Sequence, residues 1–248
     1  MHRLIPMATP GQPAARSPLA DWHAARGARF TLADGWKVAA SYGSVEQEVA
    51  AAKGLGLADV TAQSKIGFLG NGVAAAALAL LADGSLRAAR AVARLGPAGP
   101  LGCRLASDHL LLFAGRTCSA ALEESAARLA QMGDVRRYDA TCTYAVFCLL
   151  GAHGTEVLSR LTALDLSPEV LPSAACAETN VAGVHALLIR PPEPLPTAIY
   201  ICTSWDLAAY LWQRLLESGQ FAGITPIGME TYQILASQAG QSIADSRS

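Results

Sequence analysis

The residues of this chain that could do chemistry are scattered and match no catalytic pattern. Its five histidines form no H-E-x-x-H motif and no pair at metal-ligand spacing. They are His2, His23, His109, His153 and His185. The six cysteines form no C-x-x-C motif, and most lie in apolar segments, where a thiol behaves as a small hydrophobic group. We therefore expect no metal site, and we expect reduced cysteines that belong to the core.

Motifs for nucleophiles and for phosphate binding are also missing from the sequence. It contains no G-x-S-x-G elbow, no G-x-x-x-x-G-K-S/T loop and no G-x-G-x-x-G at the start of a helix. The stretch from Gly84 to Ser107 contains neither Asp nor Glu. A mechanism that needs a carboxylate from this stretch is excluded, because no such general acid or base is present there.

The composition favours a soluble globular protein that is partly covered by a protein partner. The chain has 248 residues, of which 52% are hydrophobic and 16% charged, whereas an average chain has about 25% charged residues. Its 19 basic and 20 acidic residues include no basic run that could neutralise a nucleic-acid backbone. The longest apolar run, Val73–Ala82, is shorter than the roughly 20 residues of a membrane-spanning helix. We expect neither nucleic acid nor a membrane as a partner.

The elements that must position any site are expected between residues 17 and 240. Residues 1–16 lack the apolar core of a secretory signal, so we expect a disordered tail and a cytoplasmic protein. A second disordered tail is expected at residues 241–248. Helices alternate with strands that are mostly antiparallel, which predicts an α+β fold. No repeat of fixed period is visible.

Three local patterns make specific structural predictions. Ser44, with Gln47 three residues later, is a capping box and predicts a helix over Val45–Lys53. Apolar runs at Gly56–Val60 and Lys65–Leu69 predict a pair of strands, with Asp59 fixing the loop between them. The periodicity of Thr225–Ala239 predicts a helix with Pro226 near its start.

An ordered series of short motifs provides a family resemblance. The motifs are Asp21-Trp22-His23, Gly35-Trp36, Tyr42-Gly43-Ser44, Gly56-Leu57-Ala58-Asp59-Val60-Thr61 and the closing Thr225-Pro226-Ile227-Gly228-Met229. This series resembles the glycine cleavage system T-protein, the tetrahydrofolate-dependent aminomethyltransferase, over residues 17–240. The resemblance implies two interwoven α/β lobes of the folate-binding type around a central hole that receives the pterin. The third lobe of that family, a barrel, is expected to be absent.

The resemblance also implies where a folate would bind and what is missing there. Gln63, Arg190 and Tyr232 match positions near the family's cofactor, and tetrahydrofolate is the cofactor implied. Each has a simpler interpretation from its sequence context: Gln63 as a turn residue, Arg190 as a solvated strand end, and Tyr232 as a packing residue. The family's catalytic aspartate corresponds to about Ala98 or Gly99, so the site holds no acid.

A second carboxylate of the family is also replaced. Pro191-Pro192-Glu193-Pro194-Leu195-Pro196 stands in place of the family's glycine-rich turn, and Tyr200 lies near the position of its folate-contacting glutamate. We therefore expect no catalytic residue and no aminomethyltransferase activity by this chain on its own. The chain also lacks the K-G-C-x-x-G-Q signature of the folate-binding proteins that assist iron–sulfur assembly.

Three functional hypotheses follow from these observations. The first is a degenerate T-protein-like protein that acts as a non-catalytic binding or assembly subunit in one-carbon or amine metabolism. It would have an oxidase or transferase subunit as partner, as in the similar gamma subunit of sarcosine oxidase. The second is a tetrahydrofolate-dependent aminomethyl or one-carbon transferase that works with a partner and relies on positioning. The third is a scaffold with an unrelated interaction role.

Overall fold

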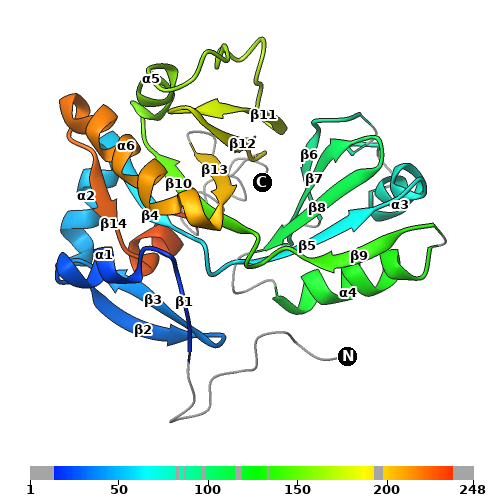
Figure 1. The fold of residues 1–248 in the computed structure, drawn as a ribbon, viewed down its shortest axis with the longest axis horizontal. Coiled ribbons are helices and arrows are strands. Elements are labelled where there is room, and N and C mark those ends of the chain that lie inside the picture. The colour runs from blue at the N-terminus through cyan, green and yellow to red at the C-terminus, as the bar shows by residue number, and fades with distance from the viewer. Residues whose placement is uncertain are drawn as a thin grey trace, which may run out of the picture.

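The computed structural model of the chain shows two large sheets side by side, each covered by helices on its outer face (Figure 1). It describes residues 14–81, 84–86, 88–95, 99–114, 119–132, 134–192 and 198–236. The predicted α+β class is confirmed, and all strand pairs in the described residues are antiparallel except β1–β3 and β4–β14. No helix in this part of the chain has the length and apolar character needed to cross a membrane.

One lobe contains a six-stranded sheet with the order β11-β12-β13-β10-β4-β14. Its strands are β4 (Gly56–Asp59), β10 (Tyr144–Leu150), β11 (Ala175–Val181), β12 (Val184–Arg190), β13 (Ile199–Ser204) and β14 (Thr225–Ile227). The helices that accompany it are α1 (Ala20–Ala25), α2 (Val45–Leu55), α5 (Gly154–Ser159) and α6 (Ala208–Gly219). A small sheet, ordered β1-β3-β2, adjoins this lobe. Its strands are β1 (Ala15–Arg16), β2 (Arg29–Ala33) and β3 (Trp36–Ser41).

The other lobe contains a five-stranded sheet with the order β6-β7-β8-β5-β9. Its strands are β5 (Ser64–Leu69), β6 (Val92–Arg94), β7 (Leu101–Ala106), β8 (His109–Ala114) and β9 (Arg136–Asp139). Two helices, α3 (Val73–Leu80) and α4 (Ser119–Ala130), cover its outer face (Figure 1). None of the sheets formed by the described residues closes into a barrel.

The ends of the chain lie mostly outside the described residues. Residues 1–13 and 237–248 belong to this part, so the predicted tails are untested there. The last residues of the predicted N-terminal tail, Ala15–Arg16, form β1 and pair in parallel with Trp36 and Lys37 of β3. The described structure therefore includes residues before position 17.

Buried apolar side chains form three clusters that follow from this layering. One lies between the six-stranded sheet and its helices and includes Phe147 and Trp212. Another lies between the five-stranded sheet and α3 and α4 and includes Phe68. The third joins the facing sides of the two large sheets, with members such as Phe113 and Tyr200. We call this third cluster the inter-lobe core.

The chain crosses between the sheets through two similar segments. Asp59-Val60-Thr61 links β4 to β5, and Asp139-Ala140-Thr141 links β9 to β10. In each, the aspartate accepts a hydrogen bond from the backbone N–H of the threonine, at 3.0 Å and 2.7 Å respectively. The predicted pairing of Gly56–Val60 with Lys65–Leu69 is therefore wrong: these runs form β4 and β5, which belong to different sheets.

The two crossovers are held against each other by their threonine hydroxyls. The hydroxyl of Thr61 accepts a hydrogen bond from the N–H of Val146 at 3.0 Å. The hydroxyl of Thr141 likewise accepts from the N–H of Lys65 at 3.2 Å. Each crossing strand thus satisfies a backbone donor of the other, which fixes how the two lobes face each other.

Asp59 also anchors the N-terminal segment to the crossover. Its buried carboxylate accepts hydrogen bonds from the Ser17 hydroxyl and from His23 Nε2, the latter at 2.9 Å. His23 is 2% exposed, and its Nδ1 lies 2.6 Å from the hydroxyl of Tyr42. Burial alone would raise the pKa of Asp59. The hydrogen bond and the charge of His23, together with hydrogen bonds from Ser17 and Thr61, instead hold this pKa below its usual value.

A second buried carboxylate anchors the C-terminal part of the described chain. Glu48 of α2 accepts hydrogen bonds from the N–H of Tyr42 at 2.6 Å, the N–H of Gly228 at 2.7 Å and the hydroxyl of Thr231 at 2.9 Å. The helix predicted over Thr225–Ala239 is wrong at its start. Residues 225–227 form the edge strand β14, which tolerates Pro226, and helical structure begins only at residue 229.

Replacing Asp59 should make the folded protein less stable. We expect Asp59→Asn to lower the free energy of unfolding at pH 7 by about 2–4 kcal/mol, because three donors lose a buried anion. Asp21→Asn, at an exposed position of α1, is the matched control. Because the folded-state pKa of Asp59 is depressed, its contribution is present above the unfolded pKa and is lost as pH falls through the folded value. Urea denaturation between pH 2 and 7 measures both effects, and an unchanged midpoint at pH 7 would contradict them.

Candidate functional site

A buried polar cluster within the inter-lobe core brings together two of the three predicted site residues. Gln63 comes from the crossover after β4, Tyr200 from β13, and Tyr232 from the helical residues 229–236. Gln63 Nε2 donates to the hydroxyl of Tyr232 at 3.3 Å, and that hydroxyl lies 2.8 Å from the hydroxyl of Tyr200. None of the three side chains is more than 6% exposed. We call this group the tyrosine cluster.

Arg94 of β6 belongs to the same neighbourhood, although the sequence did not single it out. Burial raises the pKa of Tyr232 to about 12, and the positive charge of Arg94 opposes this shift. Burial likewise raises the pKa of Tyr200, again opposed by Arg94. Arg94 NH1 donates to the carbonyl of Gly99 at 3.1 Å. The guanidinium is therefore bound to the segment where the resemblance places the family's catalytic acid. Ala98, the other matching position, lies outside the described residues.

Two polar atoms in this neighbourhood are buried without a hydrogen-bond partner among the described residues. They are Oε1 of Gln63, an acceptor, and Nε of Arg94, a donor. A buried polar group without a partner is costly, so such atoms often mark a place for a ligand or for water. The pair offers one acceptor and one donor to a small polar group.

The tyrosine cluster has no carboxylate beside it in the described part of the chain. The groups that perturb the pKa values of Tyr200 and Tyr232 are each other, Gln63, Cys148 and Arg94. Phe113 of the other lobe packs edge-on against Tyr200, with ring centroids 5.2 Å apart. The site can therefore bind hydrogen-bonding groups, but none of the described side chains around it supplies a general base.

The structure does not bring Arg190 to this cluster. Arg190 ends β12, and its neighbour Ile189 pairs with Tyr200 on the inner face of the sheet. Because side chains alternate along a strand, Arg190 points to the opposite face. Its guanidinium donates to the carbonyls of Leu171 at 2.9 Å and Leu166 at 2.8 Å, and to the hydroxyl of Thr155 at 3.1 Å. Its hydrogen bonds therefore hold the segment between α5 and β11.

The comparison with protein families decides what this fold is. Residues 19–245 match the model described as the GCVT N-terminal domain. The chain belongs to this family.

Curated relatives of this GCVT-domain chain fall into two kinds. It is 27% identical over 235 residues to the aminomethyltransferase of Saccharopolyspora erythraea, a match covering 91% of this chain and 64% of that protein. It is 25% identical over 254 residues to sarcosine oxidase subunit alpha of Corynebacterium sp., covering 92% of this chain and 26% of that protein. The chain thus spans less than two thirds of the length of these relatives.

Solved structures show the same fold. The glycine cleavage system aminomethyltransferase T from Bartonella henselae gives a TM-score of 0.69 at 19% identity, over 87% of this chain and 60% of that one. A chain of the heterotetrameric sarcosine oxidase from Corynebacterium sp. U-96 gives 0.61 at 20% identity, over 85% of this chain and 97% of that one. The predicted T-protein-like lobes are therefore confirmed as a fold.

A buried lysine lies beside the first crossover of this GCVT-domain chain. Lys65 is fully buried, and its Nζ donates to the carbonyls of Thr61 at 2.9 Å and Gln63 at 2.7 Å. Burial lowers the pKa of Lys65 to about 8, and electrostatic interactions with Cys202, Cys142, Asp59 and Asp139 oppose this shift in part. The ammonium therefore tethers the loop that carries Gln63. The sequence signal, a lysine next to an apolar strand, did not reveal this role.

The lysine should make stability depend on alkaline pH. Between the folded pKa near 8 and the unfolded value near 10.5, the unfolded chain binds more protons than the folded chain. The contribution of Lys65 to the free energy of unfolding therefore increases as pH rises through this range. Over this range the free energy of unfolding of the wild type should rise by about 3 kcal/mol relative to that of Lys65→Met. Comparing the two proteins in urea removes the contribution of other alkaline groups, and exposed Lys53→Met is the control. Parallel pH profiles for wild type and Lys65→Met would show this account to be wrong.

The cysteines are free in the described residues, as predicted. Cys103, Cys148, Cys176 and Cys202 are buried in the inter-lobe core, and only Cys142 is exposed. Cys118 lies outside the described residues. Burial raises the pKa values of Cys176 and Cys202 to about 12, so these thiols are protonated and inert at neutral pH.

Thiol labelling of the folded protein should separate these two groups. We expect Cys142→Ser to remove one equivalent of thiol that reacts with Ellman's reagent under native conditions. Cys202→Ser should leave the native count unchanged, because the buried thiol does not react before unfolding. In denaturant, either variant should show one equivalent less than the wild type. Equal native reactivity of the thiols at positions 142 and 202 would contradict the buried assignment.

Proposed function

We propose that this chain is a non-catalytic T-protein-like subunit that acts through a protein partner in one-carbon or amine metabolism. The observation that carries the proposal is the composition of the inter-lobe core. Where the resemblance places the family's acidic groups, the described chain has Gly99 and the buried Tyr200, and no carboxylate borders the tyrosine cluster. A binding or assembly role needs the fold but no general base.

The groups that remain in the core are poorly suited to proton transfer. Efficient acid–base catalysis needs a group whose pKa lies near the working pH. Burial raises the pKa of Tyr232 to about 12, and it raises that of Tyr200 as well. Both hydroxyls therefore stay protonated at neutral pH and serve as hydrogen-bonding groups.

One solved structure with this fold belongs to a larger assembly. The fold covers 97% of a chain in the heterotetrameric sarcosine oxidase from Corynebacterium sp. U-96, where it is one component of a complex. Sequence similarity to sarcosine oxidase subunit alpha points the same way. The low fraction of charged residues, 16%, agrees with a surface that is partly covered by a partner.

The orphaned polar atoms favour a second candidate function, tetrahydrofolate binding for a one-carbon transfer assisted by a partner. A pterin edge carries both donors and acceptors, which suits Oε1 of Gln63 and Nε of Arg94. Tyr232 would add a hydroxyl or a ring face. Tetrahydrofolate would supply N5 as the acceptor of the one-carbon unit, while these residues would bind and orient the ring. Arg190 is predicted to take no part, because loop carbonyls occupy its guanidinium.

Two measurements test these functions separately. Co-expression with the products of neighbouring oxidase or transferase genes, followed by size-exclusion chromatography, should give a stable complex. The chain alone should form no methylenetetrahydrofolate from an aminomethyl-lipoyl donor. The non-catalytic proposal would be overturned if the chain stayed monomeric and bound none of these partners. Folate turnover by the chain alone would also overturn it.

Anaerobic calorimetry with tetrahydrofolate tests the second function. If the tyrosine cluster binds folate, Gln63→Leu should weaken binding about tenfold, because a buried hydrogen bond to the ligand is lost. Gln213→Leu, at an exposed position of α6, should have no effect. Absence of binding by the wild type at millimolar ligand would exclude this function and leave the subunit proposal intact.

A further inference from the structure

A second group of polar side chains lies at the rim of the inter-lobe core, away from the tyrosine cluster. It consists of His109 of β8, Tyr138 of β9, Tyr144 of β10 and Glu178 of β11. We call this group the rim cluster. The first three side chains are half-buried and Glu178 is exposed, whereas the tyrosine cluster is buried. Solvent therefore reaches this rim.

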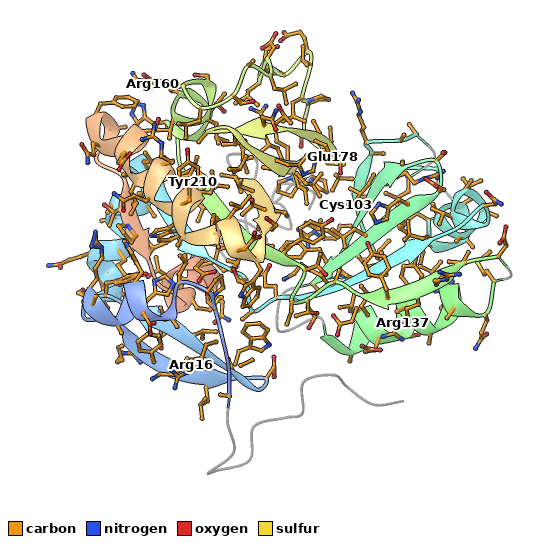
Figure 2. All side chains as sticks on the ribbon, in the orientation of Figure 1. Arg16, Cys103, Arg137, Arg160, Glu178 and Tyr210 are labelled. Atoms are coloured by element: carbon orange, nitrogen blue, oxygen red, sulfur yellow. The ribbon has the colours of Figure 1, made fainter. Side chains whose placement is uncertain are left out.

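Strand register places the rim cluster on the facing sides of the two sheets. Glu178 pairs with Leu187, which pairs with Cys202, and both partners belong to the inter-lobe core. Tyr144 lies two residues from Val146, the partner of Cys202, so its side chain is on the same face. Figure 2 shows Glu178 and Cys103 where the strands of the two lobes approach each other.

The side chain of Tyr138 lies over Gly67 of the neighbouring strand β5. A Cβ atom built on Gly67 of β5 would be only 2.0 Å from Cζ of Tyr138, so the ring rests on the backbone of this glycine. The hydroxyl of Tyr138 is held at 2.7 Å by His109 Nε2. The side chain of Tyr138 is partly buried against the inter-lobe core, so it lies on the side of the sheet that faces the other lobe.

The carboxylate of Glu178 is exposed at the rim. This carboxylate makes no hydrogen bond and no ion pair with any of the described residues. Arg90 lies in the same region, because both Glu178 and Arg90 affect the pKa of the Cys176 thiol. The hydroxyl of Tyr144 is also without a hydrogen bond in this part of the chain. The charge of Glu178 acts across the rim. Burial lowers the pKa of His109, and Glu178 opposes this shift. Burial raises the pKa of Tyr144, and Glu178 raises it further.

We propose that the rim cluster binds a small organic ammonium ion, with Glu178 as its counter-ion and the rings of Tyr138 and Tyr144 as its aromatic walls. Electron-rich ring faces with one carboxylate are the chemistry that recognises alkylated ammonium groups. An anion is disfavoured by Glu178 and by Asp108, which adjoins His109. A metal ion is disfavoured because the described residues contain no group of ligands able to hold one. This inference goes beyond the proposed function and does not depend on folate or on a partner.

Saturation-transfer NMR with trimethylammonium and with tert-butanol, which carries three methyl groups on an uncharged centre, tests the proposal on the full chain. The wild type should bind trimethylammonium and discriminate against tert-butanol. Glu178→Gln should weaken trimethylammonium binding about fivefold and Tyr138→Leu about threefold, because a charge or a ring face is lost. Tyr138→Phe keeps the ring and should bind within twofold of the wild type.

Glu169→Gln, at an exposed position in the loop before β11, is the matched control and should leave binding unchanged. Thermal melts establish that each variant is folded, and Glu178→Gln keeps the test decisive if Tyr138→Leu does not fold. Equal binding of the two probes, no binding of trimethylammonium, or full affinity in Glu178→Gln would each overturn the proposal.

Discussion

The architecture depends on the reciprocal hydrogen bonds between the two chain crossovers. Thr61 and Thr141 each bond to a strand of the other crossover, and Asp59 and Asp139 close the turns that present them. Together with the packing of the inter-lobe core, this junction fixes how the two large sheets face each other. Its position also explains why the buried polar groups concentrate nearby, because two strands that leave their sheets expose backbone groups that side chains must satisfy.

The junction makes the inter-lobe core a composite of distant segments. Gln63 leaves the first crossover and meets Tyr232, 169 residues later in the chain, while Phe113 of one lobe packs on Tyr200 of the other. Most of this core is apolar and closed, with four thiols among its members. In this GCVT-domain chain the facing sides of the two large sheets form a packed interface with a small polar centre.

The polar centre and the rim cluster differ in their solvation and therefore in what they suit. The tyrosine cluster is buried and uncharged apart from Arg94, so its energetics are those of hydrogen bonds in a dry environment. The rim cluster is half-exposed and carries the charge of Glu178. One chain thus presents two polar environments at the same inter-lobe core, and these differ in burial and in charge.

The sequence by itself determined the class of the fold, the cap at Ser44 and the lack of metal and nucleophile motifs, because these depend on local periodicity and on residue types at fixed spacing. It also led to Gln63 and Tyr232 through the family resemblance. It misjudged the pairing of β4 with β5, because the partner of a strand is set by contacts with distant segments. It misjudged the start of the last helix, because the hydrogen bond from the N–H of Gly228 to Glu48 is likewise non-local. The place of Arg190 on the outer face, the burial of Lys65 and the meeting of Tyr138 with His109 were decided by tertiary structure alone. Side-chain direction and solvation are fixed by sheet register and packing between segments far apart in the chain, which local residue order does not encode.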